Sequence, residues 1–299
     1  MTSIRKKILI TGANSLVGTG ICRYLSKKGY ELYGTYNKNN KKFDNDSCKL
    51  YKINFLNNNF EEKIFNILKK NSIEYIIHSA SLIPAKVNKP KSISTFKKIN
   101  YESTKVLIKL TKKLPIKKFI LISSLAVLNK NKSLSKVENK YLSSKKKSED
   151  LCVKFNGDVK IAILRIKAPY GFDLNSNSVV HKFIKLSLKD KSLKLINKGE
   201  RTQNFTFVDD IGKAVHNIIF HKKINKVNNL NGSRSITMKN LAIKVLKIFN
   251  KKNNHKISYI NQKDIIKKSF FIKKNEITIK NKTSIDHGLK IIYQYLKKS

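Results

Sequence analysis

A short apolar run enters a glycine-bearing turn close to the start of the chain. Residues 8–18 read ILITGANSLVG, and a stretch with helical character, 19–28, follows at once. A strand, a tight glycine turn and a helix N-terminus together direct backbone N–H groups and the positive end of a helix dipole at a phosphate. Gly12 and Gly18 match the outer glycines of this pattern, while the middle position is Ser15. The turn therefore predicts a phosphate cradle, with a plain strand-turn-helix unit as the alternative.

Apolar strands alternate with helical patterns through the first half of the chain. Such alternation predicts an α/β fold of the Rossmann type, with a doubly wound parallel sheet covered by helices on both faces. We expect strands at 8–10, 31–36, 50–55, 75–78, 119–123 and 159–165, and helices near 19–28, 60–70, 95–113 and 141–155.

Beyond residue 165 the alternation loosens, and turn-forming residues become more frequent. We therefore expect a dinucleotide-binding domain over 1–165 and a smaller, interleaved C-terminal substrate domain over 166–299. The segment at about 204–222 is expected to return to the first domain. Further helices are expected near 179–188, 209–221 and 237–250, with a short one near the end.

The formal net charge of +45 comes almost entirely from lysine, since the chain has 59 Lys and 5 Arg. The lysines are spread along the whole chain and form no basic arm. Sequence-specific DNA-binding proteins instead concentrate charge on one face and rely on arginine forks. We therefore do not expect nucleic acid to be the main partner, although a positive surface steers small anionic substrates towards a cleft.

The sequence lacks the patterns that are typical of membrane spans, signal peptides, disulfide frameworks and metal sites. No apolar run reaches the length of a membrane span, and the basic N-terminus is followed by too short an apolar stretch for a signal peptide. The three cysteines, Cys22, Cys48 and Cys152, lie in different expected elements and form no CxxC pair. No two of the six histidines have a metal-ligand spacing. We expect a cytoplasmic protein with no disulfide framework and no metal site.

Tyr141 and Lys145 are spaced i, i+4, so both side chains lie on the same side of a helix. A neighbouring ammonium lowers the pKa of a tyrosine from its usual value near 10. Such a tyrosine exchanges a proton with a hydroxyl or carbonyl group while hydride moves to or from a nicotinamide. The spacing alone carries little weight, because it also occurs at Tyr24/Lys28, Tyr101/Lys105, Tyr259/Lys263 and Tyr293/Lys297.

Sequence context selects Tyr141 from these five pairs. It lies 17 residues after Ser124, which follows the expected strand at 119–123. Ligands of doubly wound sheets bind outside the carboxyl ends of the strands. Ser124 is therefore expected to form a hydrogen bond with the reacting oxygen. The alternative is that Ser123 and Ser124 only satisfy backbone groups at the strand end.

Seven motifs occur in a characteristic order and together resemble a known family. With them the chain resembles the extended short-chain dehydrogenases/reductases of the NAD-dependent epimerase/dehydratase family, over about residues 5–245. The resemblance implies a nucleotide-sugar substrate and a homodimer formed through the helices near 95–113 and 141–155. The motifs are TGANSLVG (11–18), IIHSAS (76–81), INYEST (99–104), FILISSLAV (119–127), YLSSKKKSE (141–149), LRIKAPYG (164–171) and NFTFVDDIGKA (204–214).

The resemblance also implies roles for individual residues. Ser124, Tyr141 and Lys145 would form the catalytic triad, with Lys145 also holding the nicotinamide ribose. The glycine turn would line the pyrophosphate, and Asn54 and Phe55 would flank the adenine. The implied cofactor-binding positions are Gly12, Asn14, Ser15, Leu16, Val17, Gly18, Asn54, Phe55, Ala80, Ser81, Leu82, Asn100, Tyr141, Lys145 and Pro169.

One departure from the family pattern concerns the cofactor. NAD-type members place an acid at the end of the second strand, where it binds the ribose 2′-OH. Here residues 35–38 read TYNK, without an acid, and Lys38, Lys41 and Lys42 are available for a 2′-phosphate. This favours NADP as the cofactor, with NAD possible, and a solvated lysine loop is the alternative reading.

Other departures concern the reaction. The family's 4,6-dehydratases follow their catalytic hydroxyl residue with Asp-Glu, whereas Leu125 and Ala126 follow Ser124, so we do not expect a dehydratase. Arg201 and Arg234 are expected to bind substrate phosphate, with a plain surface position as the alternative. We expect a 4-keto-sugar reductase, partly because epimerases of the family are usually longer. A 4-epimerase and a non-catalytic dinucleotide-sensing protein are the alternatives.

Overall fold

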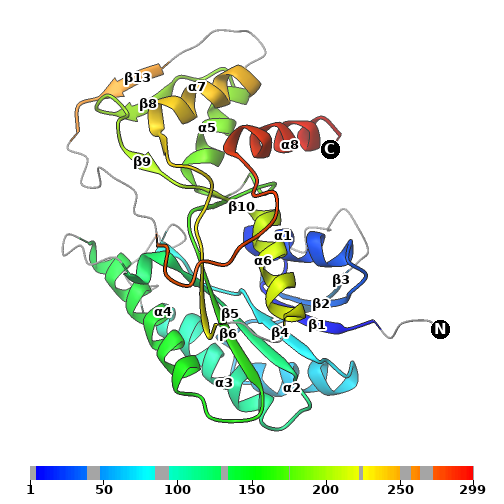
Figure 1. Cartoon of the computed structure of the whole chain (residues 1–299). Coiled ribbons are helices and arrows are strands. Elements are labelled where there is room, and N and C mark those ends of the chain that lie inside the picture. The colour runs from blue at the N-terminus through cyan, green and yellow to red at the C-terminus, as the bar shows by residue number, and fades with distance from the viewer. Residues whose placement is uncertain are drawn as a thin grey trace.

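A seven-stranded parallel sheet forms the centre of the protein (Figure 1), in a computed structural model that describes residues 5–38, 48–84, 94–128, 134–174, 176–221, 225–249, 257–262 and 272–298. The strand order is β11-β6-β5-β4-β1-β2-β3, and all neighbouring strands pair in parallel. Strands β2 and β3 follow on one side of β1 and strands β4, β5 and β6 on the other, so this order confirms the predicted doubly wound, Rossmann-type fold. The strands are β1 (Lys7–Thr11), β2 (Glu31–Tyr36), β3 (Cys48–Lys52), β4 (Tyr75–His78), β5 (Lys118–Ser124), β6 (Lys160–Ile166) and β11 (Val227–Leu230).

The central strands are apolar on both faces because helices cover both sides of the sheet. In β1, Ile8 and Ile10 are buried against α1 (Leu16–Ser26) and α6 (Val208–Phe220). Leu9, which points to the opposite face, belongs to the core formed with α2 (Phe60–Lys70), α3 (Ser103–Thr111) and α4 (Lys136–Lys154). A π-helical turn, η3 (Lys97–Glu102), leads directly into α3.

Two helices begin earlier than the periodicity predicts, because local capping sets their first turns. The helix expected from Tyr141 begins at Lys136, since the Ser135 hydroxyl accepts a hydrogen bond from the Glu138 N–H and the Glu138 carboxylate accepts one from the Ser135 N–H. This is a capping box. The helix expected at 19–28 instead spans Leu16–Ser26, with Ser15 as its N-cap.

The C-terminal elements form a second hydrophobic core at one end of the molecule (Figure 1). Tyr170, Phe205, Phe207 and Phe249 are among its fully buried side chains. Its helices are α5 (Val179–Leu188), α7 (Met238–Phe249) and α8 (Ile285–Lys298). Its strands pair as β7 (Pro169–Tyr170) with β10 (Thr206–Phe207), β8 (Leu193–Ile196) with β13 (Ile257–Ile260), and β9 (Thr202–Gln203) with β12 (Ile236–Thr237).

Segments from beyond residue 165 also contribute to the sheet layer. Helix α6 packs closely on α1: a Cβ atom at Gly20 would lie 2.4 Å from Val208 Cβ, and one at Gly212 would lie 2.4 Å from Tyr24 Cβ. Helix α6 lies within the segment 204–222, and it therefore packs on a helix of the sheet layer. Strand β11 pairs with β6 as the seventh strand of the sheet, although its residues belong to the segment that was assigned to the substrate domain.

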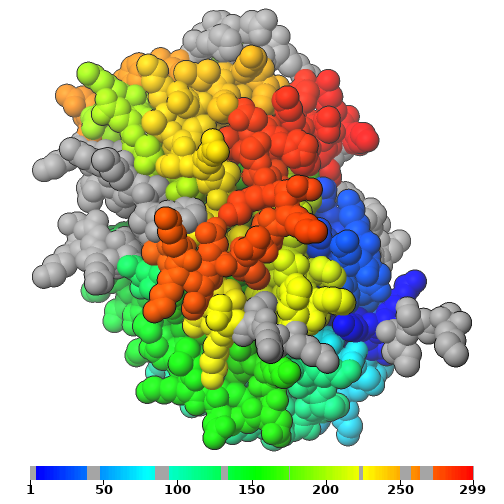
Figure 2. Space-filling model, in the orientation of Figure 1, coloured from blue at the N-terminus to red at the C-terminus, as the bar shows by residue number. Residues whose placement is uncertain are grey.

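The segment 272–284 crosses the surface between the two cores (Figure 2). It pairs with β11, where the Asn229 N–H donates to Asn275 O at 2.8 Å and the Ile277 N–H donates to Asn229 O at 3.0 Å. It is also held by α6, because the Asp210 carboxylate accepts hydrogen bonds from Thr283 N at 2.8 Å and Thr283 Oγ1 at 3.0 Å. Within the described ranges, no helix combines the length and the apolarity needed to cross a lipid bilayer.

The Asp210 contacts predict a large loss of stability when this carboxylate is removed. Asp210 is 1% exposed and also pairs with Lys213, so Asp210→Ala leaves buried donors without an acceptor. We expect the free energy of unfolding in urea to fall by about 3 kcal/mol. Asp150→Ala is the control, because Asp150 pairs with Lys146 on the surface, and it should change stability by less than about 0.5 kcal/mol. Equal losses in the two variants would contradict this role of Asp210.

Candidate functional site

The glycine turn after β1 is fastened to the end of β2 by three hydrogen bonds. The Gly12 N–H donates to Thr35 Oγ1 at 3.3 Å, and the Ala13 N–H donates to Thr35 O at 2.9 Å. The Asn14 amide donates to Lys38 O at 3.0 Å. Asn14 therefore holds the Lys38 backbone beside the turn, and the Lys38 side chain is exposed there.

Ser15 acts as the cap of α1. Its hydroxyl accepts a hydrogen bond from the Gly18 N–H at 3.1 Å, and its carbonyl accepts one from the Thr19 N–H at 2.8 Å. Among the described residues, the N–H groups of Leu16 and Val17 have no acceptor, as is usual in the first turn of a helix. Such N–H groups bind anions, so the turn fits a pyrophosphate.

The two glycines of the turn are required by its packing. Gly12 has φ +66°, in the left-handed region, and a Cβ atom there would lie 2.8 Å from Ala80 Cα. A Cβ atom at Gly18 would lie 2.2 Å from the Gly12 carbonyl oxygen. Ala80 follows β4, and its N–H donates to Thr11 Oγ1 at 3.2 Å. The segment after β4 therefore packs directly against the glycine turn.

A buried chain of hydrogen bonds runs from β1 to α3 through His78. The His78 ring bonds Thr11 Oγ1 through Nδ1 at 2.7 Å and Ser103 Oγ through Nε2 at 3.1 Å. Burial, together with the nearby Lys145 ammonium, lowers the pKa of His78 to about 3, so the ring is neutral at physiological pH. His78 is thus a structural residue of the turn.

Asn100 holds the segment after β4 against α4. Its Oδ1 accepts hydrogen bonds from Leu82 N at 2.8 Å and Ser81 Oγ at 3.1 Å, while its Nδ2 donates to Ser144 Oγ at 2.9 Å. Asn100 lies in η3 and is 2% exposed. Because Ser144 immediately precedes Lys145, these bonds set the position of α4 relative to the glycine turn.

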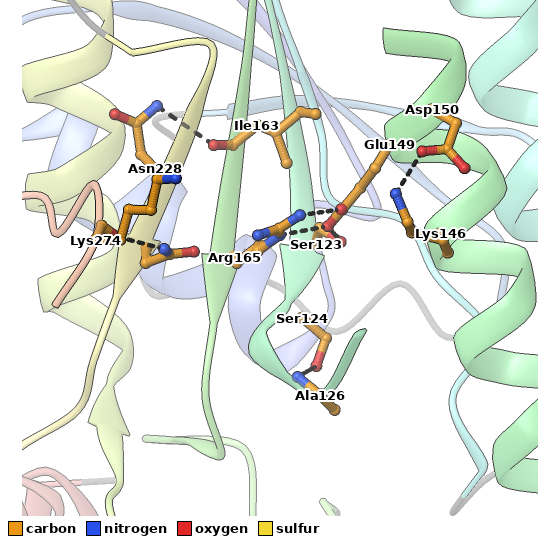
Figure 3. Close-up of polar contacts among 11 residues, drawn as sticks. Ser123, Ser124, Ala126, Lys146, Glu149, Asp150, Ile163, Arg165, Asn228 and Lys274 are labelled. Atoms are coloured by element: carbon orange, nitrogen blue, oxygen red, sulfur yellow. Dashed lines mark hydrogen bonds and ion pairs between the residues drawn. The ribbon is translucent and has the colours of Figure 1, made fainter. Parts of the chain in front are cut away.

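Ser124, Tyr141 and Lys145 meet at the carboxyl end of β5. Ser124 is the last residue of the strand, where its hydroxyl accepts a hydrogen bond from the Ala126 N–H at 3.2 Å (Figure 3). A hydrogen bond also joins Ser124 to the Tyr141 phenol. The Lys145 ammonium donates to the Ile122 carbonyl oxygen at 2.7 Å and is 4% exposed. The structure therefore brings the three predicted catalytic residues together.

The pKa of Tyr141 differs from the expected one. Burial raises the pKa of Tyr141 to about 12, and the hydrogen bond from Ser124 opposes this rise. The prediction that Lys145 lowers the pKa of Tyr141 is therefore wrong for this structure, because the ammonium is directed at the Ile122 carbonyl. Burial lowers the pKa of Lys145 to about 8, opposed by the negative charge of Glu149 and a smaller effect of Cys152.

The side chains of Asn54 and Phe55 are engaged in local structure. Phe55 is buried in the core, with its ring 5.3 Å from that of Phe60 in an edge-to-face contact. Asn54 Oδ1 accepts a hydrogen bond from the Leu56 N–H at 3.0 Å, which closes a turn. A role for the Phe55 side chain at the adenine is therefore not visible, and any contact from this residue would come from its backbone.

The remaining predicted residues belong to the second core and its border. Pro169 begins β7 and follows Ala168, whose φ of +38° places a non-glycine residue in the left-handed region. The Arg201 guanidinium donates to Gln203 Oε1 at 3.1 Å, and Arg234 is exposed. These arginines lie near opposite ends of the β9–β12 ladder. In the described part of the chain, neither forms a hydrogen bond or ion pair with the three residues at β5.

The packing of the turn gives a testable difference between two glycines. Gly12 and Gly29 both have positive φ, but a Cβ atom at Gly29 would meet nothing within 4 Å. Gly29→Ala should therefore cost only the left-handed strain, about 1 kcal/mol. Gly12→Ala should cost about 3 kcal/mol in urea unfolding, because it adds a clash with Ala80. Similar losses would mean that the turn relaxes around the added methyl group.

The chain is similar to a described protein family and to a curated protein. The family described as the NAD dependent epimerase/dehydratase family matches residues 8–231. A curated relative, the dTDP-D-glucose 4,6-dehydratase of Dictyostelium discoideum, is 27% identical over 278 residues, which cover 81% of this chain. The alignment spans 62% of that relative's length, which is less than two thirds.

Two solved structures are similar to this chain over nearly its whole length. The UDP-glucose 4-epimerase of Thermotoga maritima, solved with UDP-glucose, gives a TM-score of 0.80 at 22% identity, covering 98% of this chain and 99% of the other. The UDP-glucuronic acid 4-epimerase of Bacillus cereus, solved with UDP-glucuronic acid and NAD, gives 0.77 at 22% identity with the same coverage. At this level of identity, the likeness concerns the fold.

Proposed function

The chain belongs to the NAD dependent epimerase/dehydratase family, and from that membership we propose that it is a nucleotide-sugar 4-epimerase. The observation that carries the proposal is the meeting of Ser124, Tyr141 and Lys145 at the carboxyl end of β5, where ligands of this fold bind. The glycine turn lies two strands away, after β1, with β4 between them. Its N–H groups at Leu16 and Val17 fit the pyrophosphate of a dinucleotide.

Ser124, Tyr141 and Lys145 have distinct roles in this proposal. Bound NAD would supply the acceptor and donor of hydride at C4 of the sugar. Oxidation needs the phenolate form of Tyr141, which takes the proton of the 4-hydroxyl group and returns it during reduction. The positive charge of a bound nicotinamide would favour that form. Ser124 forms a hydrogen bond with the same sugar oxygen, and the Lys145 ammonium binds the nicotinamide ribose. Epimerisation requires that the keto intermediate is reduced on its opposite face.

Two observations favour an epimerase over the other activities. Chain length was expected to favour a reductase, but it does not count against an epimerase, because this chain aligns with 99% of the Thermotoga maritima enzyme. Water elimination needs an acid and a base after the catalytic hydroxyl residue, and here Leu125 is fully buried in the core. Family membership also leaves the non-catalytic alternative without support.

A 4-keto-sugar reductase is the second candidate, and the state of Tyr141 favours it. With its pKa raised to about 12, Tyr141 keeps the proton that reduction of a carbonyl group needs. The purified protein separates the two functions. An epimerase retains bound dinucleotide and converts UDP-glucose or UDP-glucuronic acid to the C4 epimer without net oxidation of NADH. A reductase consumes one reduced cofactor for each 4-keto sugar, and this result would replace the proposal.

For the cofactor, we infer that the site takes NAD and also accepts the 2′-phosphate of NADP. The family description and the NAD in the Bacillus cereus complex support NAD more than NADP. The described end of β2 carries no acid that would repel a 2′-phosphate, and Lys38 lies beside the turn through its bond from Asn14. Lys41 and Lys42 lie outside the described residues.

Charge reversal at Lys38 tests this inference. Lys38→Glu should weaken NADPH binding by about tenfold relative to NADH, because a carboxylate then faces the 2′-phosphate. Lys70→Glu, at the far end of α2, makes the same change in net charge and serves as the control. Dissociation constants from fluorescence titration measure both effects. An unchanged NADPH-to-NADH ratio in Lys38→Glu would remove Lys38 from the cofactor site.

Removal of one hydroxyl group tests the catalytic role of Tyr141. Tyr141→Phe should lower kcat by at least about a hundredfold, because the proton can no longer be transferred. NADH affinity should stay near the wild-type value. Tyr24→Phe is the matched control, since Tyr24 has the same spacing to Lys28 but lies on α1. Wild-type turnover in Tyr141→Phe together with a loss in Tyr24→Phe would show that another pair is catalytic.

The expected homodimer and the expected cytoplasmic location stay predictions. The structure holds one chain, and the expected homodimer through α3 and α4 would bring together exposed lysines at positions 105, 109, 146 and 147. Like charges at these positions oppose each other, so other surface groups would have to offset them. The expected cytoplasmic location is likewise untested.

A further inference from the structure

A buried ion pair lies directly behind the three residues at β5. Glu149 of α4 is 1% exposed and accepts two parallel hydrogen bonds from Arg165 of β6 (Figure 3). Arg165 Nε lies 2.9 Å from Oε1, and Nη2 lies 2.6 Å from Oε2. Ser123 Oγ donates a third bond to Oε1 at 2.6 Å. The carboxylate is therefore held by groups from two strands.

Glu149 and Lys145 are neighbours on one face of α4. They are spaced i, i+4, the separation at which helical side chains contact each other. Both reach consecutive residues of β5, since Lys145 donates to the Ile122 carbonyl and Glu149 accepts from the Ser123 hydroxyl. The sheet thus fixes a carboxylate one helical turn from the buried ammonium.

The other titratable groups around Lys145 offer no second negative charge. Burial raises the pKa of Cys152, also on α4, to about 12, so its thiol is neutral. His78 of β4 and Tyr141 of α4 are neutral at physiological pH. Arg165 of β6 is positive and opposes the ammonium. Among the described residues that act on Lys145, Glu149 is the one anion.

We propose that Glu149 is a positioning residue that keeps Lys145 protonated in the active site, while Arg165 and Ser123 hold its carboxylate in place. The proposal rests on the proposed function, because it assigns Lys145 a role in binding the nicotinamide ribose. A purely structural ion pair would not need to lie next to the ammonium, and apolar residues replace such pairs without loss of stability in many proteins.

The sign of the effect follows from the charges. Burial lowers the pKa of Lys145 to about 8, and the Glu149 carboxylate opposes this lowering. Without that negative charge, the pKa of Lys145 falls further, and the neutral amine becomes abundant near pH 7. Cofactor affinity should then decline at a lower pH, because a neutral amine binds the ribose hydroxyls less strongly than an ammonium.

Titration of NADH binding between about pH 6 and about pH 9.5 tests the proposal without any turnover. In Glu149→Gln, which keeps one acceptor oxygen for Arg165 Nε and Ser123 Oγ but loses the acceptor for Arg165 Nη2, the midpoint of the loss of affinity should move down by about one pH unit. Glu149→Asp, which keeps the charge, should retain a midpoint near the wild-type value. Asp150→Asn is the matched control, since Asp150 pairs with Lys146 at the surface of the same helix (Figure 3).

A second variant tests the proposal in case Glu149→Gln folds poorly. Glu149→Met/Arg165→Met replaces the whole pair by apolar groups and should also lower the midpoint, by less, because the opposing Arg165 charge is lost too. An unchanged midpoint in the variants without the carboxylate, a shift as large in Asp150→Asn, or a flat wild-type profile would overturn the proposal. Absence of NADH and NADPH binding by the wild-type protein would instead overturn the proposed function itself.

Discussion

The site depends on one buried set of hydrogen bonds at the carboxyl ends of β1 and β4. Thr11 bonds the neutral His78 ring and the Ala80 N–H, while His78 continues to Ser103 on α3. These bonds bring the segment after β4 so close to Gly12 that no Cβ atom fits between them. Asn100 then joins the same segment to α4. The glycine turn and helix α4, which carries Tyr141, are thereby held in fixed positions relative to each other.

Electrostatic compensation is the second constraint on the site. Taking the Lys145 ammonium out of water is costly, and its pKa falls accordingly. A chain with 64 basic and 19 acidic residues has few carboxylates with which to balance such a charge. Glu149 lies inside the protein, where its carboxylate acts most strongly on the Lys145 ammonium because little water screens the charge. The exposed lysines, by contrast, act together as a field that attracts anionic nucleotides.

Sequence patterns predicted the sheet well because each of its central strands is apolar on both faces. The strands at 31–36 and 75–78 and the helix at 60–70 have the expected bounds. The start of α4 was missed, since the signal was the short Ser135–Glu138 capping box and not the hydrophobic period. Glu149 was missed as well. It lies within the quoted motif YLSSKKKSE, four residues after Lys145, but in a sequence so rich in lysine this spacing has no visible significance.

The sequence by itself determined the alternation of elements and the turn chemistry of Gly12, and it led to the prediction of Tyr141 among five tyrosine-lysine pairs. These are local properties, set by side-chain periodicity, backbone freedom and distance along the chain. Only the tertiary structure decided the pKa directions of Tyr141 and Lys145, the structural use of Phe55, and the ion pair of Glu149 with Arg165. Burial and charge compensation arise between strands and helices that are far apart in the chain, so no local pattern records them.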